Sequence, residues 1–78
     1  MGDYEKAIAI FKQNATTYPE SANVHDSLGE AYEKAGDFDS ALKLYNLAYE
    51  KAMRIDDPNI DLYKNHISDI RKILKERL

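Results

Sequence analysis

The sequence has no cysteine and no tryptophan among its 78 residues. Without cysteine, neither a disulfide framework nor a thiolate metal site can stabilise the chain, and the redox compartment cannot be inferred. A chain of this length forms one small domain, which rarely gains more than about 3–5 kcal/mol from its core. The fold must therefore depend on the packing of a few regular elements.

Long apolar runs and a signal peptide are also missing. No stretch approaches the roughly 18 apolar residues that a membrane span needs. The N-terminus has no basic segment followed by an apolar one, which a secretory signal would show. We expect a soluble chain, in the cytoplasm rather than exported, although a targeting segment upstream of Met1 stays an open alternative.

Charge of one sign is scarce in total but unevenly distributed. The net charge is only −3, and no block of like charge is long enough to suggest a disordered tail. Residues 21–57 hold eight acidic and four basic side chains, whereas residues 58–78 hold three acidic and five basic ones. The middle of the chain is acidic and its end is basic.

The sequence repeats itself at a spacing of 34 residues. This shift places seven residues of the first segment on similar residues of a later one: Gly2 on Gly36, Asp3 on Asp37, Tyr4 on Phe38, Ala7 on Ala41, Ile8 on Leu42, Ile10 on Leu44 and Phe11 on Tyr45. A period of this length is typical of a helical repeat and differs from the leucine-rich and armadillo periods.

Apolar residues at helical spacing predict four helices. The first covers about residues 3–17 and ends before Pro19. The second follows Ser21, whose hydroxyl is suited to cap it, and runs to about residue 35. Gly29 lies within it, where a glycine costs about 0.5–1 kcal/mol relative to alanine. We expect the compensation to be a close approach of the neighbouring helix.

The third and fourth helices are predicted by the breaks that precede them. Gly36 ends the second helix in a left-handed conformation, and Asp37 caps a third helix over about residues 38–55. Asp57 as the cap and Pro58 as the first helical residue predict a fourth helix over residues 58–77. Its single apolar stripe is typical of a helix that closes the end of a repeat array.

The central hairpin resembles one complete tetratricopeptide repeat. The residues that match the signature of this family are Leu28, Gly29, Tyr32, Gly36, Asp37, Phe38, Ala41, Tyr45 and Ala48. The resemblance implies an all-α fold of antiparallel helical hairpins in a right-handed superhelix. We interpret residues 1–78 as one domain with three parts: residues 2–19 form the second helix of a truncated repeat, residues 22–55 a complete repeat, and residues 58–77 a capping helix.

The resemblance also implies a function, because the first helices of such repeats line a groove that holds a peptide or a partner's helix. We expect the chain to be a protein-interaction scaffold without catalytic activity. The expected groove face of the second helix carries Asn23, Asp26, Ser27, Glu30, Glu33 and Lys34. Since these side chains are mostly acidic, a neutral or basic partner is expected rather than an acidic tail. A simple solvated helix face is the alternative.

A second surface is expected on the first helix. In the repeat family, residues at the positions of Ala7 and Phe11 pack on the first helix of their own repeat, which this sequence lacks. We therefore expect exposed apolar surface there unless another chain or domain covers it. Self-association through Ala7 and Phe11, or through the opposite end of the domain, is the resulting prediction.

No catalytic, cofactor or metal site is expected from spacing along the chain. His25 and His66 have no second ligand one helical turn away in a metal-binding motif. Ser27, Ser40 and Ser68 lack the glycine-rich turn of a serine nucleophile. The basic side chains after residue 70 favour the dipole at the end of the last helix. We expect neither nucleic acid nor membrane as a partner.

A further resemblance leaves a second function open. Residues 18–24 and 26–32 are similar to the C-terminal tail of certain bacterial serine hydrolases and esterases. That resemblance implies a regulatory or structural appendage of an enzyme, possibly one that mediates self-association. The sequence upstream of Met1 would distinguish the two functions.

Overall fold

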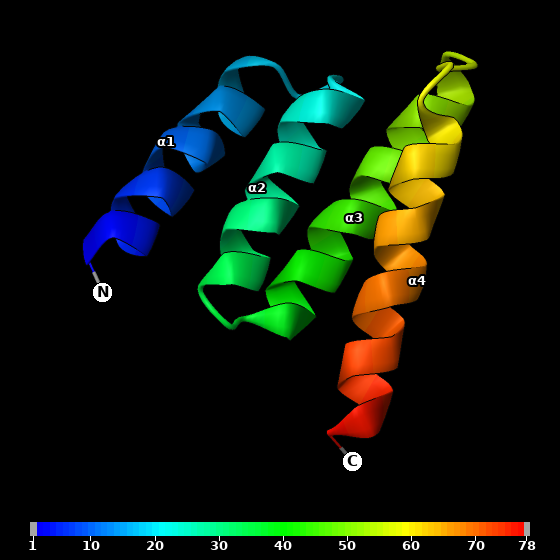
Figure 1. Cartoon of the computed structure of the whole chain (residues 1–78). Coiled ribbons are helices and arrows are strands. Elements are labelled where there is room, and N and C mark those ends of the chain that lie inside the picture. Colours follow the sequence, from blue (N-terminus) through cyan, green and yellow to red (C-terminus); the bar gives the residue numbers. More distant parts are fainter. Residues whose placement is uncertain (1, 78) are drawn as a thin grey trace.

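The computed structural model describes residues 2–77 and forms four helices joined by short turns (Figure 1). Their bounds are α1 Gly2–Thr17, α2 Ala22–Lys34, α3 Phe38–Arg54 and α4 Ile60–Glu76. Successive helices run in opposite directions, and no strand occurs within residues 2–77. The predicted all-α fold of antiparallel hairpins is confirmed. The two end residues of the expected domain, 1 and 78, lie outside the described residues.

The α2–α3 hairpin is held at both of its ends by side-chain caps. The Ser21 Oγ accepts a hydrogen bond of 3.2 Å from the backbone N–H of Val24. At the turn, Gly36 has a φ of 86°, and the Asp37 carboxylate accepts one hydrogen bond of 3.1 Å from the Ser40 N–H and one of 2.7 Å from the Ser40 hydroxyl. Each predicted cap therefore satisfies backbone groups that the helix leaves free.

Gly29 allows α2 and α3 to approach each other closely. A Cβ atom at this position would lie 2.7 Å from Cε1 and 2.8 Å from Cδ1 of the Tyr45 ring. Tyr45 is only 1 % exposed, so the ring has little room to move away. The expected compensation for a glycine inside a helix is confirmed.

The core runs along α3, which lies between α2 and α4. Its most buried side chains form two groups. One group is Ala22, Ala48, Ala52 and Tyr63, and the other is Ala41, Tyr45, Ile67 and Ile70. Alanines on α3 let the neighbouring helices come close, while Tyr63, Ile67 and Ile70 on one face of α4 fill the remaining space. The single apolar stripe of the last helix is thus buried as predicted.

The predicted start of the fourth helix was wrong. Asp57 and Pro58 lie in a turn, and α4 begins at Ile60 after Asn59, whose side chain makes no cap hydrogen bond. The reason is local, because the Asp57 carboxylate accepts a hydrogen bond of 2.8 Å from the N–H of Asn59, only two residues further on. An aspartate bonded in this way stabilises a turn rather than a helix start.

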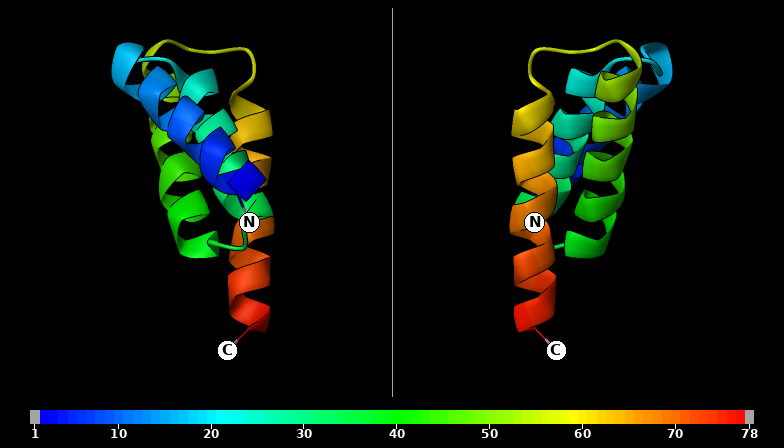
Figure 2. Two further views of the ribbon diagram at one scale, coloured as in Figure 1. Left: turned by 90° about the vertical axis from the view of Figure 1, so that its left-hand side faces the viewer. Right: turned by 90° about the vertical axis from the view of Figure 1, so that its right-hand side faces the viewer.

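The helix α1 packs on one side only. Figure 2 shows α1 and α4 on opposite sides of the α2–α3 hairpin. No residue of Gly2–Thr17 is buried. Among the residues that the structure describes, no helix has the length and hydrophobicity needed to span a membrane.

Candidate functional site

A hollow of about 260 Å³ lies between α2 and α4. Its lining comes from three helices and consists of Glu30, Glu33, Lys34, Tyr45, His66 and Asp69. Three of these six side chains are carboxylates and one is an amine, so the hollow carries a net negative charge whenever His66 is neutral. We call it the α2–α4 groove.

Asp26 and His66 connect the two walls of this groove. The His66 Nδ1 lies 2.7 Å from the Asp26 Oδ1, within hydrogen-bond distance across residues that are 40 apart in the sequence. Asp26 is only 4 % exposed. Its burial raises the pKa of its carboxyl group above the ordinary value, while the hydrogen bond from His66 acts in the opposite direction. The expectation that Asp26 lies on the exposed face was wrong, because α4 covers it.

Glu33 is fixed by a second hydrogen bond inside the groove. The Tyr45 hydroxyl donates to the Glu33 Oε1 over 2.7 Å. Burial of Tyr45, followed by its contact with Glu33, raises the pKa of the tyrosine hydroxyl above its ordinary value. The hydroxyl therefore remains a donor at every pH at which the protein is normally handled. The Tyr45 ring also packs on the His66 ring, with 5.1 Å between the centroids.

The other expected groove residues lie along both sides of α2. Glu30 and Lys34 line the α2–α4 groove, but they also line a second hollow between α1 and α2, together with Ser27. Asn23 is exposed near the start of α2. Sequence reasoning did not include Tyr45, His66 or Asp69. The only signal for them was the polar face of the last helix, on which Asp69 had been placed.

The second hollow has a volume of about 330 Å³ and a more apolar wall. Its lining consists of Asp3, Tyr4, Ala7, Phe11, Ser27, Glu30, Ala31 and Lys34. Ala7 and Phe11 are half-buried there, and Tyr4 is 43 % exposed. We call this hollow the α1–α2 groove. It is the place next to the first helix where an uncovered surface was expected.

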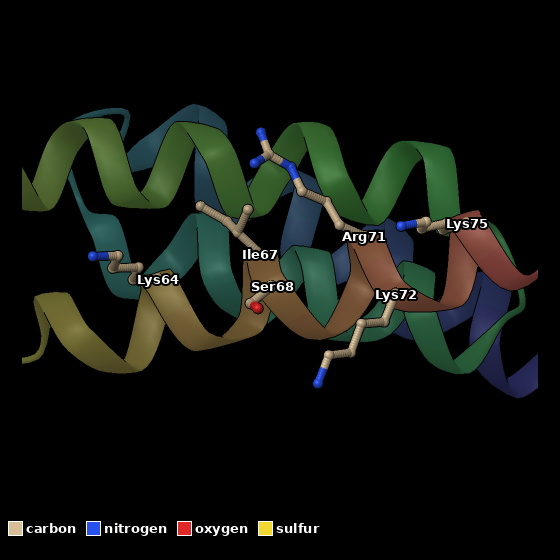
Figure 3. Close-up of a pocket in the computed structure, with 6 residues that line it drawn as sticks. All are labelled: Lys64, Ile67, Ser68, Arg71, Lys72 and Lys75. Atoms are coloured by element: carbon tan, nitrogen blue, oxygen red, sulfur yellow. The ribbon is translucent and has the colours of Figure 1, made fainter.

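A third hollow lies on α4 alone and is basic (Figure 3). It has a volume of about 380 Å³ and is lined by Lys64, Ile67, Ser68, Arg71, Lys72 and Lys75. The amine and guanidinium groups point in several directions and do not converge on one point. This surface therefore shows no built anion site.

One group of side chains has the composition of a metal site. Ligand atoms of Asp26, Glu30 and His66 all lie within 4.8 Å of one another. The expectation of no metal site considered spacing within single helices, and this group combines residues of two helices. The two histidines also differ, because the Nδ1 of buried His25 lies 2.7 Å from the backbone carbonyl of Ser21 in its own helix.

The comparison with family models identifies the class of protein. The tetratricopeptide repeat model matches residues 1–54, which is more than half of the chain and includes α1, α2 and α3. The chain belongs to the tetratricopeptide repeat family. Neither the curated proteins nor the solved structures gave a match. The similarity of residues 18–32 to hydrolase tails thus has no support from these comparisons and stays a prediction.

Proposed function

We propose that this tetratricopeptide repeat is a protein-interaction module that holds a neutral or basic segment of a partner in the α2–α4 groove. Repeat arrays of this kind act as scaffolds through their concave surface. The observation that supports the location is the hollow lined by side chains of α2, α3 and α4. We propose no chemistry for the module itself.

The charge of the groove favours a basic ligand over an acidic one. Glu30, Glu33 and Asp69 face a single amine, that of Lys34. Glu30 and Asp69 are exposed, so a lysine or arginine of the ligand can pair with each of them without full loss of hydration. Exposed pairs of this kind contribute only about 0.2–1 kcal/mol each. They select the sign of the ligand's charge more than they determine its affinity.

The test compares peptides of one length and different charge. Calorimetric titration with lysine-rich, neutral and glutamate-rich peptides is expected to give binding in the order basic, neutral, acidic. The double variant Glu30→Gln, Asp69→Asn should weaken binding of the basic peptide about tenfold, as expected for two lost exposed pairs. The matched control is Asp39→Asn, Glu50→Gln, which removes the same charge from exposed positions of α3. Equal affinity for acidic and basic peptides would overturn the proposal.

Self-association through the α1–α2 groove is a second candidate. Ala7 and Phe11 are half-buried in that groove, next to exposed Tyr4. Uncovered apolar surface of this kind favours contact with another chain. Sedimentation at micromolar concentration is expected to show a dimer that Phe11→Glu dissociates. Ile10→Glu is the control, because Ile10 is 59 % exposed and does not line the groove. A monomer at all concentrations would exclude this candidate.

The appendage of a hydrolase is a different function for the same domain. It requires a catalytic domain in the same gene, which the sequence upstream of Met1 would reveal. The peptide titration separates it from the scaffold function, since an appendage of this kind need not bind a peptide in the α2–α4 groove.

A further inference from the structure

The three side chains that meet beside the α2–α4 groove form a mixed carboxylate and imidazole set. Asp26 and Glu30 are one turn apart on α2, so they project on the same side of the helix. His66 approaches them from α4. Their ligand atoms lie within 4.8 Å of one another. Two carboxylates and one imidazole are a donor set that zinc sites use, with water at the remaining position.

The buried carboxylate of Asp26 is poorly compensated by the protein itself. Asp26 is 4 % exposed, and its partner among residues 2–77 is the His66 imidazole, which carries a charge only when protonated. Loss of hydration raises the pKa of this carboxyl group more than the hydrogen bond from His66 lowers it. A buried anion is normally paired with a cation or bound to a metal. A divalent ion would supply the charge that Asp26 lacks.

The imidazole of His66 is held in place before any ion arrives. Its ring packs on Tyr45 with 5.1 Å between centroids, and the Tyr45 hydroxyl is fixed by Glu33 at 2.7 Å. Contacts that orient a histidine ligand raise metal affinity, because less freedom is lost on binding. The adjoining hollow of about 260 Å³ is lined by both Glu30 and His66. It gives an ion a path to the ligands and leaves space for bound water.

We propose that Asp26, Glu30 and His66 form a binding site for a divalent ion of the zinc class, which goes beyond the proposed binding of a partner protein. Imidazole favours such ions over magnesium and calcium, which prefer oxygen ligands only. Nδ1 becomes the ligand when the proton moves from Nδ1 to Nε2 through solvent, which leaves the imidazole neutral.

The geometry requires only a small adjustment. Zinc binds nitrogen and oxygen at about 2.0–2.2 Å in a tetrahedral arrangement, which separates two donor atoms by about 3.3 Å. The Nδ1 of His66 and the Oδ1 of Asp26 are 2.7 Å apart. They must therefore move apart by about 0.6 Å, a shift that side-chain rotation can provide. The bound ion would connect α2 to α4 and stabilise both walls of the groove.

The charges around the site predict how its affinity can be tuned. Glu33 and Asp69 line the same hollow and attract a cation, whereas Lys34 repels one. Glu30 is exposed, so its replacement should leave the fold intact. The variants Glu30→Gln and Lys34→Gln therefore change the affinity in opposite directions without touching the core.

The test is calorimetric titration of the whole chain with zinc chloride, after treatment with a chelator and without any peptide. We expect one zinc ion per chain, with binding about 100-fold weaker for His66→Gln and about tenfold weaker for Glu30→Gln, effects at least as large as those of removing outer-shell partners. Lys34→Gln should bind more tightly. The matched control Glu50→Gln, which removes one exposed carboxylate from α3, should bind as the wild type does.

A spectroscopic measurement complements the titration. Cobalt(II) bound by these residues should show strong visible absorption bands, and NMR should show a shift of the His66 ring without a shift of the His25 ring. No heat change at millimolar zinc, or equal affinity in the wild type, Glu30→Gln and Glu50→Gln, would overturn the proposal. Because no peptide is present, this result is independent of whether the groove binds a partner.

Discussion

The helices α1 and α3 have similar sequences at a shift of 34 residues, yet they differ in burial. Ala41 is 0 % and Tyr45 1 % exposed on α3, while their counterparts Ala7 and Phe11 on α1 are only half-buried. The helix α3 has α2 on one side and α4 on the other, whereas α1 packs on α2 alone. In a repeat protein, the neighbours of a helix determine its burial as much as its own sequence does.

This difference explains why the two ends of the domain present different surfaces. The side of α3 that faces α4 is closed by Ile67 and Ile70. The corresponding side of α1 is open and forms the α1–α2 groove. Equivalent positions thus contribute to stability in one helix and to a possible contact surface in the other. Paired substitutions at such positions test this interpretation.

The largest difference is expected between Tyr45→Ala and Phe11→Ala. Removal of the buried Tyr45 ring should lower the free energy of unfolding by about 3–5 kcal/mol, enough to unfold a domain of this size. Removal of Phe11 should cost only about 1 kcal/mol, because its contacts are on one side. Urea unfolding followed by circular dichroism measures both. Similar losses for the two variants would contradict the comparison.

A smaller difference is expected between Gly29→Ala and Gly2→Ala. An added methyl group at Gly29 would lie within 2.8 Å of two atoms of the Tyr45 ring, whereas nothing lies within 4 Å of a methyl group at Gly2. We expect Gly29→Ala to lower the free energy of unfolding by about 1–3 kcal/mol, as overpacking does. Gly2→Ala should leave it nearly unchanged. Thermal unfolding of both variants decides, and a stabilised Gly29→Ala protein would show that the helices separate easily.

Next in size is the pair Asp37→Ala and Asp3→Ala, which are 34 residues apart. Asp37 caps α3 through two hydrogen bonds to Ser40, and its loss should cost about 1 kcal/mol. Asp3 lies inside the first turn of α1, where a carboxylate interacts with the helix dipole for about 0.3–1 kcal/mol. Guanidinium unfolding is the measurement. A larger loss for Asp3→Ala would reverse the expected order.

The pH dependence of the Asp37 cap is the smallest expected effect. Its hydrogen bonds with Ser40 lower the pKa of the carboxyl group below the model value of 3.8. A lowered pKa in the folded state adds stability above pH 3.8, and this stability is lost as the pH falls through the folded-state value. The difference in stability between wild type and Asp37→Ala should therefore shrink below about pH 4. A difference that stays constant from pH 6 to pH 3 would contradict the cap as its source.

The sequence alone predicted the parts of the fold that depend on local signals. The repeat period and the caps at Ser21 and Asp37 located α2 and α3, because these signals come from residues close together in the chain. The start of α4 was predicted wrongly, since Asp57 has the composition of a cap but bonds to the N–H of Asn59. Turn and helix caps use the same residue types.

The candidate site was less predictable than the fold. Glu30, Glu33 and Lys34 were placed correctly beside a groove by helical periodicity. Asp26 has a polar side chain on the same face, and only the position of His66, 40 residues later, explains why it is buried. Periodicity shows which face of a helix is polar. It does not show which distant helix covers part of that face.

The two grooves beside α2 allow one direct test of the proposed function. Amide NMR spectra of the whole chain can be followed during titration with a lysine-rich peptide. We predict that chemical shifts change mainly at the residues of the α2–α4 groove, including Glu33, His66 and Asp69, while Ala7 and Phe11 remain unaffected. Shifts confined to Ala7, Phe11 and their neighbours, or no shifts at all, would contradict the assignment of the α2–α4 groove as the binding site.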